Sequence, residues 1–343
     1  MTEEMYKQLN FYLNGIFKEL EKDDSFFINN ILQISIIGNK LLTLIEDYDL
    51  KKSEIKANLT YNDVYLLARE IIEKIDKNYL KYYDKLIESG EIDFNYEGDY
   101  ADSVCIHCFT TGQNFININM EFNYLDVAVL VHEFMHYTNA LTKLYSINRH
   151  IITEAISIYF EEFAKIYLLK KGIDKSELWF SERLYYTSNT IKNFDNYNII
   201  LLAYSKFGNI NKNTYKMLNQ FFLHIPEEEF EKMCINELKL LEKKSKEIEF
   251  KIKMEYGKIP NDYEQKLFCK LIKLINVDYK YIFGTMVAYN ALEKSSLEQM
   301  VYLNNNINEI NLDIGELLES INVKLEELDF NYIKKVLEEG KIK

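Results

Sequence analysis

Residues 126–136 read Asp126-Val-Ala-Val-Leu-Val-His132-Glu133-Phe134-Met135-His136 and place a His-Glu-x-x-His pattern inside an apolar segment. At 3.6 residues per helical turn, His132 and His136 lie one turn apart on the same face, so both imidazoles can reach one metal ion. Glu133 stands beside the first histidine, where its carboxylate can act on a metal-bound water without binding the metal. The pattern predicts a zinc site, with one ion per chain, on a buried helix. The alternative is a pair of core histidines with polar partners.

A catalytic zinc site needs a third protein ligand and an open position for water. Glu154 is the first candidate, because it lies 18 positions after His136 in a second stretch of helical periodicity, residues 151–171. Two antiparallel helices joined by the loop around residues 146–149 would bring its carboxylate opposite the two histidines. His150 is the competing candidate and comes just before that helix.

A further glutamate follows on the same helix. Glu161 lies seven residues, or nearly two turns, after Glu154, so the two share one stripe of the helix. An acid there can accept a hydrogen bond from a metal-binding imidazole and fix its orientation. We therefore predict that Glu161 orients His132 or His136. The alternative is that Glu161 and Glu162 form a solvent-facing pair.

The rest of the chain predicts a mainly α fold. Apolar side chains recur at spacings of three and four, as in amphipathic helices, in residues 2–22, 28–48, 61–89, 124–144, 151–171, 227–256, 261–275, 279–293 and 324–339. Residues 103–109 and 115–120 are instead alternating or β-branched, and residues 110–114 have the composition of a turn. These two segments predict a small β-hairpin or sheet at the cleft.

The composition limits the class of protein. The 343 residues are 48% hydrophobic, enough for a sizeable core, and carry a net charge of −13. That charge repels phosphate backbones and anionic lipid, so we expect neither nucleic acid nor membrane as a partner. The lack of a long apolar run and of a signal-peptide pattern at the start favours a cytoplasmic location. Four cysteines make no disulfide framework, and we expect buried thiols rather than a metal site at Cys105-Ile-His107-Cys108.

Residues 113–172 resemble the gluzincin metallopeptidases of the oligoendopeptidase F and thimet oligopeptidase family. In that family a glutamate ligand on the next helix is followed by a serine at +3 and an acid at +7, an order that Glu154, Ser157 and Glu161 match. This chain departs from the family in its shorter length before the motif, in a shorter loop between His136 and Glu154, in Met135 where glycine is common, and in having no histidine after residue 224.

A second segment, Tyr279-Lys-Tyr281-Ile-Phe-Gly284, resembles the family's tyrosine- and glycine-containing segment, whose tyrosine hydroxyl hydrogen-bonds the developing oxyanion. Attack on a peptide carbonyl creates negative charge that such a donor stabilises. Tyr281 is the first candidate, Tyr279 the second and Tyr289 a distant third. The alternative is that they are packing residues, as most of the 27 tyrosines must be.

The predicted hairpin suits an extended peptide, because peptides commonly bind by adding a strand to an exposed sheet edge. Asn117 and Asn119 point to the strand face opposite Ile116 and Ile118, so we predict that the two asparagines contact substrate. An ordinary half-buried hairpin is the alternative.

Together these patterns predict a helical segment, residues 1–98, followed by a zincin-like catalytic domain, residues 99–343. The predicted function is that of a zinc metalloendopeptidase acting on oligopeptides or unfolded segments. His132, His136 and Glu154 would bind the metal, and Glu133 would act as general base. Two alternatives stay open: a processing peptidase with one protein substrate, and a catalytically silent relative that binds peptides or a partner. The sequence leaves the oligomeric state open.

Overall fold

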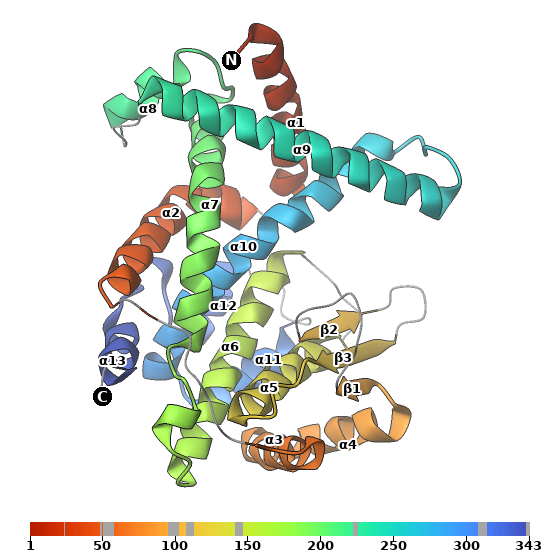
Figure 1. Ribbon diagram of the computed structural model, residues 1–343, viewed down its shortest axis with the longest axis vertical. Helices are drawn as coiled ribbons and strands as arrows, with labels where there is room; N and C mark the ends of the chain where they lie inside the picture. Colours follow the sequence, from red (N-terminus) through yellow and green to blue (C-terminus); the bar gives the residue numbers. More distant parts are fainter. Residues whose placement is uncertain are drawn as a thin grey trace. The chain divides into compact units, whose positions relative to one another are not determined.

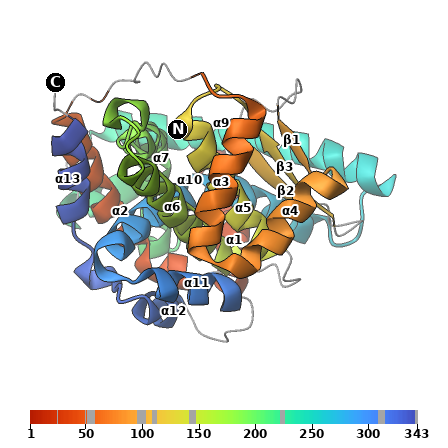
Figure 2. The same ribbon diagram turned by 90° about the horizontal axis from the view of Figure 1, so that it is seen from below.

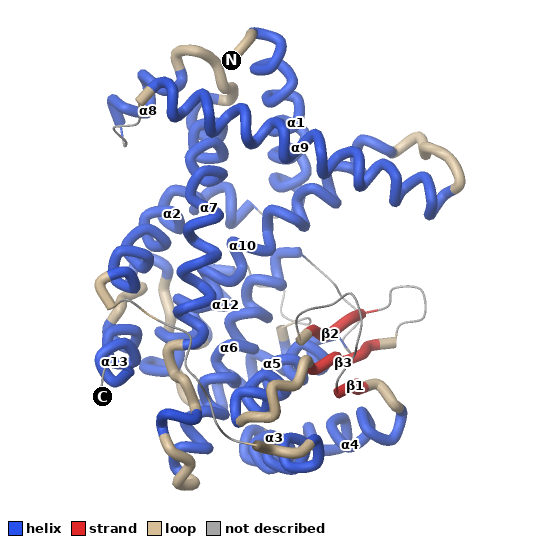
Figure 3. The backbone as a smooth tube through the Cα atoms, in the orientation of Figure 1, coloured by secondary structure: helices blue, strands red, loops and turns tan. Residues whose placement is uncertain are grey.

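The computed structural model describes residues 1–23, 25–48, 50, 58–94, 103–107, 113–140, 147–221, 226–307 and 314–340. The fold is mainly α with one small sheet, as the sequence predicted (Figures 1 and 3). The chain divides into two compact units: unit 1 contains residues 1–42 and 189–279, and unit 2 contains residues 43–188 and 280–343. No helix in the described ranges is long and apolar enough to cross a membrane.

Unit 1 consists of helices. Helix α9 (Glu227–Tyr256) packs against α1 (Glu3–Asp23) and α8 (Thr214–Phe221). Pro226, with φ −60° and ψ 144°, is the N-cap of α9, and three glutamates occupy its first turn, where negative charge stabilises a helix. Three helices contribute residues to both units: α2 (Ser25–Glu46), α7 (Glu182–Phe207) and α10 (Tyr263–Lys294).

Helix α10 corrects one prediction. The sequence suggested separate helices over residues 261–275 and 279–293, but the backbone is helical without a break from Tyr263 to Lys294. The physical reason is that residues 263–283 contain neither glycine nor proline to interrupt the helix.

Unit 2 is built around two long helices that pack along one another, α5 (Tyr124–Ala140) and α6 (Ile147–Lys170). Helix α3 (Tyr61–Ile75) lies against α5 (Figure 2). Val127, Leu130, Val131 and Phe134 of α5 are all fully buried, so the apolar side chains of this helix form part of the core of unit 2. The other described helices that lie wholly in unit 2 are η1 (Lys77–Tyr79), α4 (Leu80–Ser89), η2 (Lys175–Glu177), α11 (Leu297–Asn306), α12 (Ile314–Ser320), η3 (Leu325–Glu327) and α13 (Asn331–Gly340).

The sheet has the strand order β1-β3-β2. Strand β2 (Val104–His107) pairs antiparallel with β3 (Asn114–Ile118), so the two predicted strands form; the turn predicted between them lies mostly outside the described residues. Strand β1 (Ile92–Phe94), which the sequence did not predict, pairs parallel with β3. The sheet packs against α5, with Ile116 and Ile118 buried. The domain boundary near residue 98 stays a prediction; it falls between β1 and β3, which pair with each other.

Candidate metal centre

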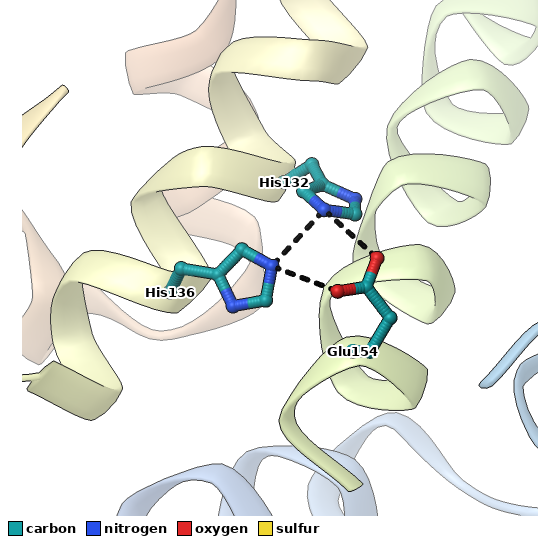
Figure 4. Close-up of side chains that lie close together, drawn as sticks. All are labelled: His132, His136 and Glu154. Atoms are coloured by element: carbon teal, nitrogen blue, oxygen red, sulfur yellow. Dashed lines mark hydrogen bonds and ion pairs between the residues drawn. The ribbon is translucent and has the colours of Figure 1, made fainter. Parts of the chain in front are cut away.

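Helices α5 and α6 bring three predicted metal ligands together (Figure 4). His132 and His136 project from neighbouring turns of α5, with their Nε2 atoms 3.1 Å apart. Glu154 faces them from α6: its Oε1 lies 3.6 Å from His132 Nε2, and its Oε2 lies 3.5 Å from His136 Nε2. The Glu154 side chain is only 1% exposed, whereas that of His136 is 21% exposed, so the group is closed on the α6 side and more open at His136.

These separations fit a metal ion. A tetrahedral ion bound to nitrogen and oxygen at about 2.0–2.2 Å holds its donor atoms about 3.3–3.6 Å apart. The three separations in the structure are 3.1, 3.5 and 3.6 Å. Two imidazoles and one carboxylate can therefore hold a divalent metal ion with little rearrangement, and three protein donors leave a fourth position for water.

Glu161 fixes the direction in which His132 points. Its Oε2 lies 2.8 Å from His132 Nδ1, so the ring donates from Nδ1 and turns the lone pair of Nε2 toward His136 and Glu154. Burial alone would lower the pKa of His132. The hydrogen bond to Glu161 and the charges of neighbouring glutamates raise this pKa by more than burial lowers it, so the net shift is upward. Glu161 and Glu162 are both buried, so the alternative of a solvent-facing pair is wrong.

Two cationic side chains contact Glu161: that of Lys165 is fully buried, and that of Arg183 is half-buried. Lys165 Nζ lies 3.4 Å from Glu161 Oε1 and 3.0 Å from Glu162 Oε1, and Arg183 Nη2 donates to Glu161 Oε2. Burial alone would raise the pKa of Glu161, but the charges of Arg183 and Lys165 hold it well below its usual range. Burial raises the pKa of Glu162 to about 7, against the opposing charge of Lys165. The sequence reasoning missed both cations; the one signal for Lys165 was its spacing of four from Glu161 and three from Glu162.

Glu133 differs from these glutamates. It is 7% exposed, and within the described residues its carboxylate has no hydrogen-bond or ion-pair partner. Cys105 of the nearby sheet feels this carboxylate: burial and the charge of Glu133 together raise the pKa of the Cys105 thiol. Because no cation holds the Glu133 carboxylate, it is available to exchange a proton with a water or a substrate.

The tyrosine candidates are placed differently. Tyr281 is half-buried on α10 and lies one turn before Gly284, on the same face of the helix. Gly284 lies against Glu154, so this face of α10 is beside the candidate ligand. The Tyr279 side chain lies outside the described residues. Tyr289 is fully buried, and burial together with the charges of Glu162 and Glu161 raises its pKa. The role of each tyrosine stays a prediction.

Gly284 allows α10 to approach α6 at the candidate ligand. A Cβ at this position would lie 3.2 Å from Glu154 Cγ and 3.3 Å from the backbone nitrogen of Ala155. Both contacts are tight, and the second is to backbone that cannot rotate away. The glycine therefore gives Glu154 the room to reach the histidines.

Replacing Gly284 with Ala is expected to weaken metal binding by roughly 3- to 30-fold, because the added methyl displaces Glu154. The free energy of unfolding of the metal-free protein should change less than the metal affinity does. Alanine stabilises a helix relative to glycine by about 1 kcal/mol, which offsets part of the strain. Competition with a chromophoric chelator measures the affinity, and thermal melts with and without metal separate the two effects. Wild-type affinity in this variant would mean that Glu154 moves freely or does not bind metal.

The remaining predicted residues lie as follows. Asn117 on β3 is buried and lines a hollow of about 310 Å³ together with residues of β1 and β2, and Asn119 is exposed just after the strand. Their contact with substrate stays a prediction. The side chain of His150 lies outside the described residues. Cys105, Cys234 and Cys269 form no disulfide, and Cys108 is outside the described ranges.

Two histidines and a glutamate from adjacent helices thus define a candidate metal centre. No family model matches the chain, and no curated protein matches its sequence. Among solved structures it is similar to a protein from Bacillus anthracis provisionally described as an oligoendopeptidase F, with 12% identity and a TM-score of 0.46. The similarity covers 99% of this chain and 55% of the other, so the chain spans about half the length of that protein.

Proposed function

We propose that this chain is a zinc metalloendopeptidase that hydrolyses peptide bonds in oligopeptides or unfolded segments. The observation that carries the proposal is the convergence of His132, His136 and Glu154, at separations of 3.1–3.6 Å, beside a glutamate that no cation holds. Two nitrogen donors and one carboxylate oxygen suit zinc, and a third protein ligand with an open position is the pattern of catalytic rather than structural zinc sites.

Each residue has a definite task in this proposal. His132, His136 and Glu154 hold the ion, and Glu161 orients His132. Zinc, when bound, supplies a Lewis acid that polarises the peptide carbonyl and lowers the pKa of a water.

The proton transfers fall to the chain's own side chains. Glu133 accepts a proton from the attacking water and delivers it to the leaving amine nitrogen. Tyr281, with Tyr279 as second choice, donates a hydrogen bond to the oxygen that gains negative charge. Asn117 and Asn119 are the proposed contacts to the peptide backbone.

The direct test combines metal analysis with a cleavage assay on the purified full chain. We expect one zinc per chain and cleavage of a quenched mixed-peptide library, lost on treatment with a chelator and restored by added zinc. Cleavage of one protein but not of the library would favour a processing peptidase. Zinc-replete protein that binds peptides and never cuts them would overturn the proposal in favour of a catalytically silent relative.

A further inference from the structure

A compact group of buried and half-buried charges surrounds Glu161, on the Nδ1 side of His132 and away from the candidate metal position. Its members are Glu161, Glu162 and Lys165 of α6 and Glu182 and Arg183 at the start of α7. The Lys165 side chain is 0% exposed and contacts three carboxylates: Glu162 Oε1 at 3.0 Å, Glu182 Oε2 at 3.3 Å and Glu161 Oε1 at 3.4 Å. Charges removed from water are costly, and each member of this group lies beside a charge of opposite sign that offsets part of this cost.

Arg183 has a different set of contacts from Lys165. Its Nη2 donates to Glu161 Oε2, the same oxygen that lies 2.8 Å from His132 Nδ1. Lys165 is shared among three acceptors, and its contact with Glu161 is the longest of the three. Arg183 is therefore the cation whose charge-assisted hydrogen bond holds Oε2 beside His132 Nδ1.

The placement of Arg183 is locally unfavourable. It lies in the first turn of α7, where the partial positive charge of the helix end disfavours a cation, and its side chain is only 17% exposed. Among the described residues, its buried Nε has no hydrogen-bond partner. A residue that breaks local rules in this way is expected where it serves a functional site.

We propose that Arg183 is a positioning residue for the metal centre. It holds the Glu161 carboxylate so that Oε2 accepts from His132 Nδ1, and this keeps His132 Nε2 directed toward His136 and Glu154. The chain of contacts runs from α7 to α6 to α5 and ends at the first candidate ligand. This role rests on the proposed zinc site but not on peptide hydrolysis.

A double-mutant cycle on zinc affinity tests the proposal. Arg183→Met and Glu161→Gln are each expected to weaken zinc binding by roughly 10- to 100-fold, the range for residues that orient metal ligands. If Arg183 acts through Glu161, the double variant should bind no more weakly than Glu161→Gln alone. Affinity is measured by competition with a chromophoric chelator, and the visible spectrum of the cobalt-substituted protein reports any change in ligand geometry.

A matched control separates positioning from general destabilisation. Glu182→Gln changes the residue next to Arg183 in the same helical turn, and Glu182 belongs to the same charge group through its ion pair with Lys165. Among the described residues, Glu182 makes no hydrogen bond or ion pair with His132, and it feels Glu161 only as a neighbouring charge. We expect this variant to keep wild-type zinc affinity and an unchanged cobalt spectrum, even if its melting temperature falls as far as that of Arg183→Met.

The proposal is overturned if Arg183→Met binds zinc like the wild type, or if the two single effects add in the double variant. Should Arg183→Met not fold, Arg183→Gln, which keeps a polar side chain and loses the charge, takes its place in the cycle and is judged by the same two outcomes. If the wild-type protein binds zinc and cleaves no peptide, the proposed function is wrong, but the double-mutant cycle still tests the role of Arg183 because it measures zinc affinity alone. Absence of zinc binding by the wild type would overturn both.

Discussion

Replacing Glu133 with Gln is expected to lower peptide turnover by about 10³-fold or more while one zinc per chain stays bound. Glutamine keeps the shape of the side chain but cannot accept a proton, and positioned general bases contribute roughly 10²- to 10⁴-fold to rate. Glu133 is the described glutamate near the metal position whose carboxylate no histidine or cation holds. Its loss should therefore remove a proton acceptor and leave the ligands in place.

The control for this variant is Glu70→Gln. Glu70 accepts a hydrogen bond of 2.6 Å from Tyr167 of α6, and a glutamine oxygen can accept it as well. That variant should keep full turnover. Zinc content is measured on both proteins beside the cleavage rate. If Glu133→Gln cleaved peptides at the wild-type rate, Glu133 would not be the general base; if it lost its zinc, Glu133 would have to be a ligand.

The parts of the site that the sequence revealed are those encoded by short spacings. His132 and His136 are four residues apart, and a single turn of α5 brings their Nε2 atoms to 3.1 Å. Glu154 required one more assumption, that α5 and α6 pack side by side, and the structure shows this packing. Glu161 then followed from the repeat of the helix. Local geometry was therefore sufficient for the histidine pair and for the spacing of Glu161 from Glu154, whereas the approach of Glu154 to the histidines also required the packing of α6 on α5.

The parts that the sequence did not reveal depend on contacts between distant segments. Arg183 meets Glu161 across 22 residues, and Gly284 meets Glu154 across a much longer separation, so no periodic pattern marks either residue. Strand β1 is three residues long and pairs parallel with β3, a pairing that only the tertiary fold provides. Helix α7 was not predicted because its sequence is rich in polar residues and lacks an apolar stripe at helical spacing, which is the pattern that indicates a helix in a sequence.

Replacing Glu154 with Ala is expected to weaken zinc binding by more than roughly 100-fold, since losing a ligand should cost more than losing a residue that only orients one. The carboxylate is buried and lies 3.6 and 3.5 Å from the two Nε2 atoms, one oxygen facing each. Two imidazoles on one helix would remain, and two donors bind zinc weakly.

Thermal unfolding gives a second measure of the same loss. A metal that binds only the folded state stabilises it by RT ln(1 + [L]/Kd), so zinc should raise the melting temperature of the wild type and barely change that of Glu154→Ala. His150→Ala is the matched variant, because His150 was the competing candidate on the same helix and should keep wild-type affinity. The reverse pattern, with zinc lost in His150→Ala and retained in Glu154→Ala, would move the third ligand by one helical turn and require the geometry of the centre to be assigned again.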